Sequence, residues 1–371
     1  MRFICNQQSL AKALNIVSKA VTTRTTIPIL KGILLEVTPD NKLKMSASDL
    51  DITIEETIDI LDGTSGSVVV QSRLFGDIVR KLPNAPVSVS LEDENVRIKC
   101  MNSDFNIIGL SPDEFPNIVN ENQGEKYITF NKNLLRDMIR KTSFAASIDE
   151  SKGVITGILI ELENNQINLV AIDGYRMAVT REAMITENEH KVIISAKIMN
   201  EINKILSEVD EDEENVKLLL NDQKAILIVG NVKVVLRLLE GSFIPYKDIL
   251  PKDNNITVKV NRSDFMESIE RASLFSKEGK NNLIKLSIQD TVITITSKSE
   301  EGNLREEIIV EKNGNDLDIG FNAKYVLDVL KSIDDEEILM LFNTGITPCL
   351  ITPVEGEKYV YLILPVRLAS N

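Results

Sequence analysis

The chain has 371 residues, of which 43% are hydrophobic and 26% are charged, proportions that are ordinary for a folded globular protein. Its formal net charge is −14, with 42 Lys and Arg against 56 Asp and Glu, which argues against a tight, uniformly basic nucleic-acid binder. No apolar run is long enough to cross a membrane, the N-terminus lacks a basic-then-apolar signal segment, and the three cysteines lack CxxC spacing, so we expect a cytoplasmic protein with reduced thiols.

The first third of the chain predicts a helix, four strands, a second helix and three more strands. Apolar periodicity predicts a first helix over 10–21 and a second helix that opens at Arg73. Alternating apolar residues predict strands at 32–37, 43–48, 52–58, 68–70, 87–91, 96–100 and 105–110. A proline-rich break at 111–116 and a polar linker at 120–125 then end the pattern.

The same pattern returns twice. Asn6, Asn131 and Asn261 each follow a short apolar strand and are expected to cap the helix that comes next. The segment 32–37 is echoed at 157–162. A repeat of about 125 residues is far longer than a solenoid unit, so each copy should be a domain with its own core.

We therefore predict three domains, at 1–122, 126–250 and 255–371, with a second linker at 250–255. Strands outnumber helices and mostly alternate, which favours an α+β class with antiparallel sheets and helices on one face.

The second helix of every copy carries a base, an acid four residues later and a second base seven residues after the first. These residues are Arg73, Asp77 and Arg80; Lys197, Glu201 and Lys204; and Lys324, Asp328 and Lys331. At about 100° per residue the cations lie nearly opposite the apolar stripe. They form either intrahelical salt-bridge ladders or a repeated cationic face that contacts one long polyanion.

Acidic residues are clustered, which reconciles a basic face with the negative net charge. The runs lie at 92–94, 210–214, 300–301 and 334–337, in expected turns or at helix ends. Such a protein can attract a polyanion on one surface and repel it elsewhere.

The sequence contains no sign of catalytic chemistry. It has no phosphate-binding glycine loop, no metalloprotease motif and no nucleophile elbow, and its one histidine, His190, stands in a polar link, where a histidine is most often a surface residue. We expect no catalytic residue, no metal and no cofactor.

One stretch, 171–178, departs from its counterpart in the first copy because it contains Gly174, Tyr175 and Arg176. It is either a tight hairpin that needs the glycine or part of a small apolar cleft with a polar rim for a peptide.

Four segments together give the chain a family resemblance over essentially its whole length. They are Thr26-Ile27-Pro28-Ile29-Leu30 after Arg24, Asp173-Gly174-Tyr175-Arg176-Met177, Phe321-Asn322-Ala323-Lys324-Tyr325 with the helix that follows, and Leu364-Pro365-Val366-Arg367-Leu368. In this order and with the threefold repeat, they resemble the bacterial sliding clamps, the beta subunits of DNA polymerase III. The resemblance implies a DNA-clamp fold, in which two subunits join head to tail as a ring, with sheets outside and helices around a central hole.

The resemblance also implies function and site residues. The ring would enclose duplex DNA without sequence preference, hold the replicative polymerase, the clamp loader and repair proteins through a short glutamine-and-leucine-rich peptide, and have no catalytic activity. DNA-binding residues would be Arg24, Arg73, Arg80, Lys197, Lys204 and Lys12, with Lys19 on the same outward face as Lys12. Lys324 and Lys331 are set apart because the first helix of the third copy carries Glu267 and Glu270 on its outward side.

Two further sets of residues follow from the resemblance. The interface between subunits would join Leu74, Phe105 and Ile107 to Leu274 and Phe275 of the other copy. The peptide cleft would be lined by Ile155, Ile172, Gly174, Tyr175, Arg176, Met177, Ile244, Pro245, Ile249, Leu362, Leu364, Pro365, Val366 and Arg367, with its two arginines at the rim.

Two alternatives remain open at this point. An acidic three-domain scaffold that binds only proteins would share the composition, and it would not be retained on circular DNA. An unrecognised hydrolase would need an activity that survives mutation of the basic helices.

Overall fold

The computed structural model describes residues 1–22, 24–116, 127–185, 189–221, 223–276 and 282–368. It divides into two compact units, one of residues 1–135 with 201–238 and the other of residues 136–200 with 239–371. The predicted linker at 120–125 lies outside the described residues. The three-domain division at 1–122, 126–250 and 255–371 stays a prediction.

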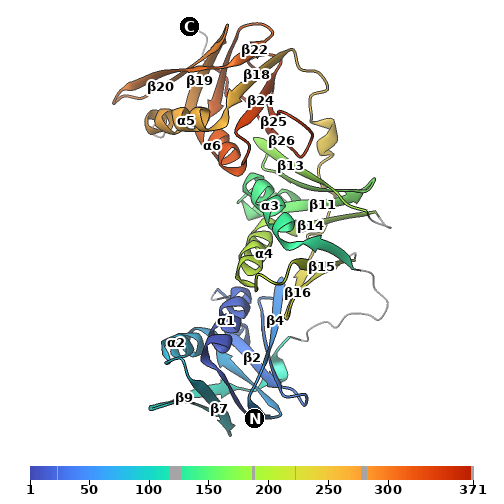
Figure 1. Cartoon of the computed structure of the whole chain (residues 1–371), viewed down its shortest axis with the longest axis vertical. Coiled ribbons are helices and arrows are strands. Elements are labelled where there is room, and N and C mark those ends of the chain that lie inside the picture. Colours follow the sequence, from blue (N-terminus) through green and yellow to red (C-terminus); the bar gives the residue numbers. More distant parts are fainter. Residues whose placement is uncertain (23, 117–126, 186–188, 222, 277–281, 369–371) are drawn as a thin grey trace. The chain divides into compact units, whose positions relative to one another are not determined.

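The first unit contains one antiparallel sheet with two helices on it. Its described strands follow the order β10-β15-β16-β17-β4-β3-β2-β6-β9-β8-β7-β1-β5. Their bounds are β1 Arg2–Asn6, β2 Gly32–Val37, β3 Lys42–Ser48, β4 Ile52–Asp59, β5 Asp62–Thr64, β6 Gly66–Gln71, β7 Pro86–Glu92, β8 Asn95–Cys100, β9 Ser103–Leu110, β10 Ile128–Asn131, β15 Asn215–Leu220, β16 Lys224–Val229 and β17 Val232–Arg237. Helices α1 (Gln7–Val17) and α2 (Ser72–Lys81) contact each other, and α1 packs on β3 and β4 (Figure 1).

The first helix shows why these residues fold as they do. The side chain of Asn6 accepts a hydrogen bond from the backbone N–H of Gln8 at 2.8 Å, and this bond caps α1. Leu10 and Leu14, one turn apart, are fully buried against the sheet. Asn131 and Asn261 make equivalent caps, so the predicted role of the three asparagines is confirmed.

The second unit contains two antiparallel sheets. The described strands run β14-β11-β12-β13-β26-β25-β24-β18-β22 in one sheet and β21-β20-β19-β23 in the other. Their bounds are β11 Gly157–Glu163, β12 Gln166–Ile172, β13 Arg176–Ala183, β14 His190–Ser195, β18 Ile256–Asn261, β19 Leu283–Gln289, β20 Val292–Lys298, β21 Asn303–Ile309, β22 Glu311–Asn313, β23 Leu317–Asn322, β24 Glu337–Phe342, β25 Cys349–Pro353 and β26 Tyr359–Ile363. Helix α5 (Arg262–Ser276) packs on β19, β20 and β21 and contacts α6 (Ala323–Ser332) (Figure 1).

Two helices, α3 (Lys132–Thr142) and α4 (Ala196–Glu208), contain residues of both units. Short 3₁₀ turns complete the described helices at Ser18–Ala20, Pro28–Lys31, Pro112–Glu114, Ser143–Ala145, Glu150–Thr156 and Tyr246–Asp248.

Strands from neighbouring repeats join into continuous sheets. Strand β17 pairs with β4 in the first unit, and β13 pairs with β26 in the second, where Met177 lies opposite Leu362. The cores of successive repeats are therefore connected through backbone hydrogen bonds. The predicted α+β class with antiparallel sheets is confirmed.

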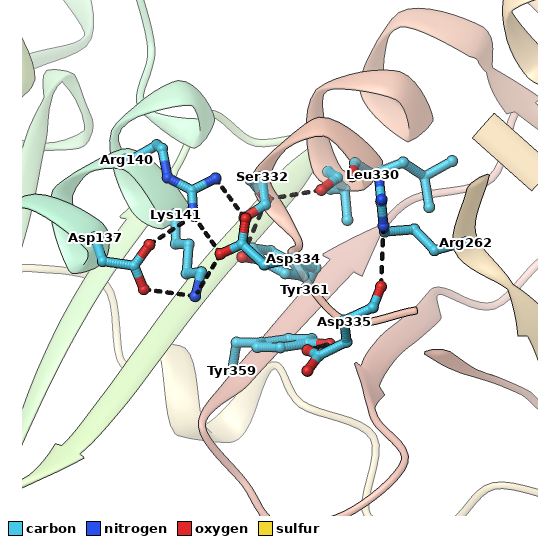
Figure 2. A network of polar contacts seen from close by, with 11 residues as sticks. Asp137, Arg140, Lys141, Arg262, Leu330, Ser332, Asp334, Asp335, Tyr359 and Tyr361 are labelled. Carbon is cyan, nitrogen blue, oxygen red and sulfur yellow. Dashed lines mark hydrogen bonds and ion pairs between the residues drawn. The ribbon is translucent and has the colours of Figure 1, made fainter. Parts of the chain in front are cut away.

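A polar network ties α3 to the end of the chain within the second unit. Arg140 and Lys141 both pair with Asp334, just after α6, and Tyr359 donates to a carboxylate oxygen of Asp335 at 2.6 Å (Figure 2). Burial alone would raise the pKa of Asp334, but the hydrogen bonds from Lys141 and Arg140 outweigh it and hold that pKa below its ordinary value. The network fixes the segment between α6 and β24.

Candidate functional site

The first cation of each repeated helix is exposed and available. Arg73, Lys197 and Lys324 are the second residues of α2, α4 and α6, and none of the three pairs with an acid in the part of the chain that the structure describes. Arg24 is also exposed, in the loop that precedes the turn Pro28–Lys31. These cations are free to meet an anion from outside.

The second cation of each helix is already paired. Its partners are Asp77 for Arg80 at 2.6 Å, Glu201 for Lys204 at 2.8 Å, and Glu270 of α5 for Lys331 at 2.9 Å. In α2 and α4 these pairs lie within one helix, as the salt-bridge interpretation expects, whereas Lys331 of α6 pairs with a different helix. The second base forms a salt bridge, while the first base stays exposed.

Lys12 of α1 and Lys19 of the 3₁₀ turn that follows it also have acidic partners in the first unit. Lys19 pairs with Glu208 at 2.8 Å, and Lys12 pairs with Asp210, where the acidic run 210–214 begins. That run starts just after α4, as expected, and its first residue pairs with a cation of α1. Lys12 is therefore partly neutralised, unlike Arg73.

The predicted interface residues differ in exposure. Leu74, Phe105 and Leu274 are exposed, and Phe275 is half-buried. Ile107 lies opposite Val96 of β8 and is buried.

A cavity of about 500 Å³ lies between α5 and α6. It is lined by Glu270, Ser273, Leu274, Ser276, Asn282, Ala323, Lys324, Leu327, Asp328 and Lys331. None of the residues predicted for the peptide cleft lines this cavity. It is a separate feature of the second unit, and the exposed Leu274 forms part of its lining.

The residues predicted for the peptide cleft, here named the peptide site, share one apolar base. Ile172, Met177 and Leu362 lie in one core cluster with Tyr246, and Ile244 packs against it. Met177 lies opposite both Ile172 in β12 and Leu362 in β26, so three adjacent strands supply the base.

The remaining residues of the peptide site lie above that base. Ile155, Pro365 and Val366 are half-buried, and Gly174, Tyr175, Pro245, Ile249, Leu364 and Arg367 are exposed. Apolar side chains at the surface, over a buried apolar base, are suited to anchoring the apolar residues of an extended peptide.

The turn between β12 and β13 is a tight hairpin. Gly174 has φ of +95°, a conformation that side-chain-bearing residues rarely adopt. The Asp173 carboxylate accepts hydrogen bonds from the backbone N–H groups of Tyr175 at 2.8 Å and Arg176 at 3.0 Å. The hairpin interpretation is thus confirmed, and the carbonyl of Tyr175 accepts from the N–H of Leu364 at 2.9 Å, which joins the turn to the C-terminal segment.

Arg176 does not stand at a rim. Its residue exposure is only 7%, and its guanidinium pairs with Asp173 at 3.0 Å and with Asp328 of α6. It also donates to the carbonyl of Phe144 at 2.8 Å. The expectation of two arginines at the rim is wrong for Arg176, although Arg367 is exposed.

A buried carboxylate holds the segment that bears Ile244 and Ile249. The Tyr246 phenol donates to Glu161 Oε2 at 2.6 Å, and Lys191 and Lys247 lie 2.9 and 3.1 Å from the same carboxylate. Burial alone would raise the pKa of Glu161, but these three donors outweigh it and lower that pKa. Burial and the same hydrogen bond raise the pKa of Tyr246, so the phenol stays protonated.

The thiols are buried. Cys5, Cys100 and Cys349 form no disulfide, and burial raises the pKa of Cys5 to about 12. Across the described ranges, no cluster of three or more His, Cys, Asp and Glu is placed to hold a metal ion. Among the described helices, none is both long and apolar enough to span a membrane.

The chain matches three family models in succession. They are the N-terminal domain of the DNA polymerase III beta subunit over residues 1–119, its central domain over 129–245 and its C-terminal domain over 247–367.

Relatives and solved structures agree along the whole length. A beta sliding clamp of Staphylococcus epidermidis is 35% identical, with 99% of each chain covered, and one of Staphylococcus aureus is 34% identical with the same coverage. The crystal structure of the DNA polymerase sliding clamp from Bacillus subtilis has 34% identity and a TM-score of 0.95, with 100% of both chains covered. A sliding clamp from Pseudomonas aeruginosa, solved with griselimycin bound, has 27% identity and a TM-score of 0.93, with 99% of this chain and 100% of that chain covered.

With three successive domain matches and more than a third of its residues identical to those of a relative of the same length, the chain belongs to the DNA polymerase III beta subunit family, the bacterial beta sliding clamps.

Proposed function

We propose that this chain is the processivity clamp of a bacterial replicative polymerase. Two copies close into a ring around duplex DNA, and the ring tethers the polymerase, the clamp loader and repair proteins without catalysing any reaction. A tethered polymerase keeps an effective local concentration in roughly the millimolar range, so it rebinds before it diffuses away.

One observation carries this function: all three clamp domains match in order over the chain, and a relative named as a beta sliding clamp aligns over 99% of both lengths. We also propose domain boundaries near 1–122, 126–250 and 255–371, which the threefold repeat supports. Family membership further supports a cytoplasmic location.

For DNA, we propose that Arg73, Lys197 and Arg24 make the main phosphate contacts, because these cations are exposed and lack an acidic partner among the described residues. Arg80, Lys204 and Lys12 contribute less, since each shares its charge with a carboxylate. Weak contacts of this kind suit a ring that slides, because its topology keeps it on the DNA.

For partners, we propose that the peptide site takes a short extended peptide with apolar anchors. Its apolar base, its exposed rim and the nearby cation Arg367 support this assignment. We further propose that Leu74 and Phe105 meet Leu274 and Phe275 of the second copy, because three of these four side chains are exposed apolar groups.

The test is retention on DNA. The protein is loaded onto a nicked circular plasmid with a bacterial clamp loader and ATP, and bound protein is separated by gel filtration. A single restriction cut should release it, and blocking the ends of the cut DNA with bound protein should restore retention. Equal loss from intact circles and linear DNA would reject the clamp and favour the acidic scaffold.

A further inference from the structure

The acid in the middle of the repeated helix has a different partner in the third copy. Asp77 pairs with Arg80 at 2.6 Å, and Glu201 pairs with Lys204 at 2.8 Å, each within its own helix. Asp328, at the equivalent position of α6, pairs with Arg176 from the turn before β13. The corresponding base of α6 is bonded elsewhere, to α5. In the third copy the acid therefore forms its ion pair outside its own helix, with a residue of the peptide site.

The Arg176 guanidinium is surrounded by hydrogen-bond acceptors and aromatic rings. Its guanidinium bonds Asp173, Asp328 and the carbonyl of Phe144, which come from three different segments. Its charged group also lies 4.7 Å from the ring centre of Tyr325 and 5.3 Å from that of Phe144. A guanidinium this buried needs its charged partners, because an unpaired charge in the same place is strongly unfavourable.

The turn that ends at Arg176 carries the exposed aromatic side chain of the peptide site, Tyr175. Tyr175 is 56% exposed, and its ring stacks on Tyr325 of α6 with the ring centres 6.0 Å apart. Its backbone carbonyl holds the N–H of Leu364. The position of Arg176 therefore sets the position of both Tyr175 and the first residue of the C-terminal segment.

We infer that Asp328 is a positioning residue of the peptide site: it anchors Arg176 and so keeps Tyr175 and Leu364 in place for the peptide. This inference rests on the proposed peptide-binding function. Asp328 acts through Arg176, and α6 serves as the fixed support. Because a site held in its binding conformation loses less entropy on association, loosening this support should weaken binding without removing any side chain of the site.

The test measures binding of a fluorescein-labelled synthetic peptide with a glutamine-and-leucine-rich clamp motif to the full-length protein. Asp328→Asn should weaken binding on the order of tenfold. Asp77→Asn and Glu201→Gln, the same change at the equivalent positions of the other repeats, should bind like the wild type. Asp328→Glu keeps the charge and should recover most of the loss.

A second measurement separates positioning from general stability. The chain contains no tryptophan, so Tyr175→Trp places a single fluorescent reporter in the turn. Adding Asp328→Asn should make that tryptophan easier to quench with acrylamide, whereas adding Glu201→Gln should leave the quenching unchanged. Urea unfolding of the same variants shows whether the fold as a whole has weakened.

The outcomes are distinct. If the wild type fails to bind the peptide, the proposed peptide site is wrong. If the wild type binds and Asp328→Asn binds equally well, or loses unfolding stability with unchanged affinity and quenching, Asp328 is an ordinary structural residue and the inference is wrong. If Asp328→Asn does not fold, the charge-retaining Asp328→Glu is compared with an Asp328→Ala variant of equal stability. Peptide binding by Asp328→Glu that is no tighter than binding by Asp328→Ala would also overturn the inference.

Discussion

At the scale of single residues, Glu56 is a buried carboxylate on which burial and a nearby cation act in opposite directions. It lies in β4, is 8% exposed, and its Oε2 atom has no hydrogen-bond partner among the described residues. Burial raises its pKa to about 7, Lys12 opposes this shift, and Asp210 and Glu208 add to it. Since the folded protein holds this proton more tightly than the unfolded chain, the stability that protonated Glu56 contributes is present below about pH 4.5 and is lost as the pH rises through 7.

Glu56→Gln should therefore stabilise the protein in mildly alkaline solution. The side chain keeps its size but cannot become a buried anion, so the free energy of unfolding at pH 8 should rise by on the order of 3 kcal/mol. The gain should shrink toward zero near pH 5. Urea titrations at both pH values measure it. The neighbouring Glu55→Gln is the control, because that carboxylate lies 3.7 Å from Lys44 and its loss should bring no gain. Equal stability of Glu56→Gln and the wild type at pH 8 would contradict this account.

The sequence identifies the residues of the 173–176 turn but not their environment. Asp173 next to Gly174 indicates a turn from local chemistry alone. Nothing local indicates that Arg176 is buried, because Asp328 is 152 positions away along the chain. The only signal in the sequence is the repeat itself, which places Asp328 where Asp77 and Glu201 form intrahelical pairs.

At the scale of elements, alternation and helical periodicity predict most of the first repeat. The strand predicted at 43–48 is observed as Lys42–Ser48, and the helix predicted to open at Arg73 begins one residue earlier. Strands β5 and β22 were not predicted, because three mostly exposed residues carry no apolar alternation. The joining of β17 to β4 was not predicted either, since edge pairing between distant strands leaves no periodic signal.

The repeated basic helices lead to a prediction about DNA. Replacing Arg73 and Lys197 by Glu should weaken DNA binding. The plot of log K against log salt should become less steep, by about one unit of slope for each lost phosphate contact. Reversing Arg80 and Lys204 should cost less, because both already hold a carboxylate. Fluorescence anisotropy with labelled duplex DNA at several salt concentrations measures both.

The control for that measurement changes the charge by the same amount elsewhere. Lys217→Glu with Lys358→Glu alters two exposed lysines outside the proposed DNA residues and should leave the salt slope unchanged. If the variant with Glu at positions 73 and 197 loads onto DNA and slides as the wild type does, the repeated cations only stabilise their helices.

At the scale of the whole molecule, the sequence predicts three repeats, while the fold packs into two compact units. The sheets explain the difference, because β17 pairs with β4 and β13 pairs with β26, so residues of neighbouring repeats share a core. The repeats are counted from the spacing of similar segments along the sequence. The compact units depend instead on which strands pair in space.

Assembly of two copies leads to a prediction about Leu274, which is 64% exposed on α5. Leu274→Arg should give a folded monomer, because a buried, unpaired guanidinium at the proposed interface costs about 3 kcal/mol or more. Light scattering measures the mass and circular dichroism checks the fold. Ile185→Arg, at an apolar residue that is 93% exposed outside the proposed interface, should remain a dimer. An unchanged dimer mass for Leu274→Arg would reject this interface.

A deletion in the C-terminal segment should separate partner binding from DNA enclosure. Leu364 bonds the turn at Tyr175, and Val366 bridges to Gly320 of β23, so this segment supplies one side of the peptide site without contributing to the repeated basic helices. Deleting residues 364–371 should leave a dimer that still encloses circular DNA, because the cations and the proposed interface are intact. Peptide binding should fall by at least tenfold, and polymerase stimulation with it, since the exposed apolar side chain of Leu364 and the charge of Arg367 are both lost. Deleting only residues 369–371 is the control and should preserve both activities. Full polymerase stimulation by the longer deletion would show that partners bind elsewhere, whereas loss of DNA retention would show that the segment supports the fold.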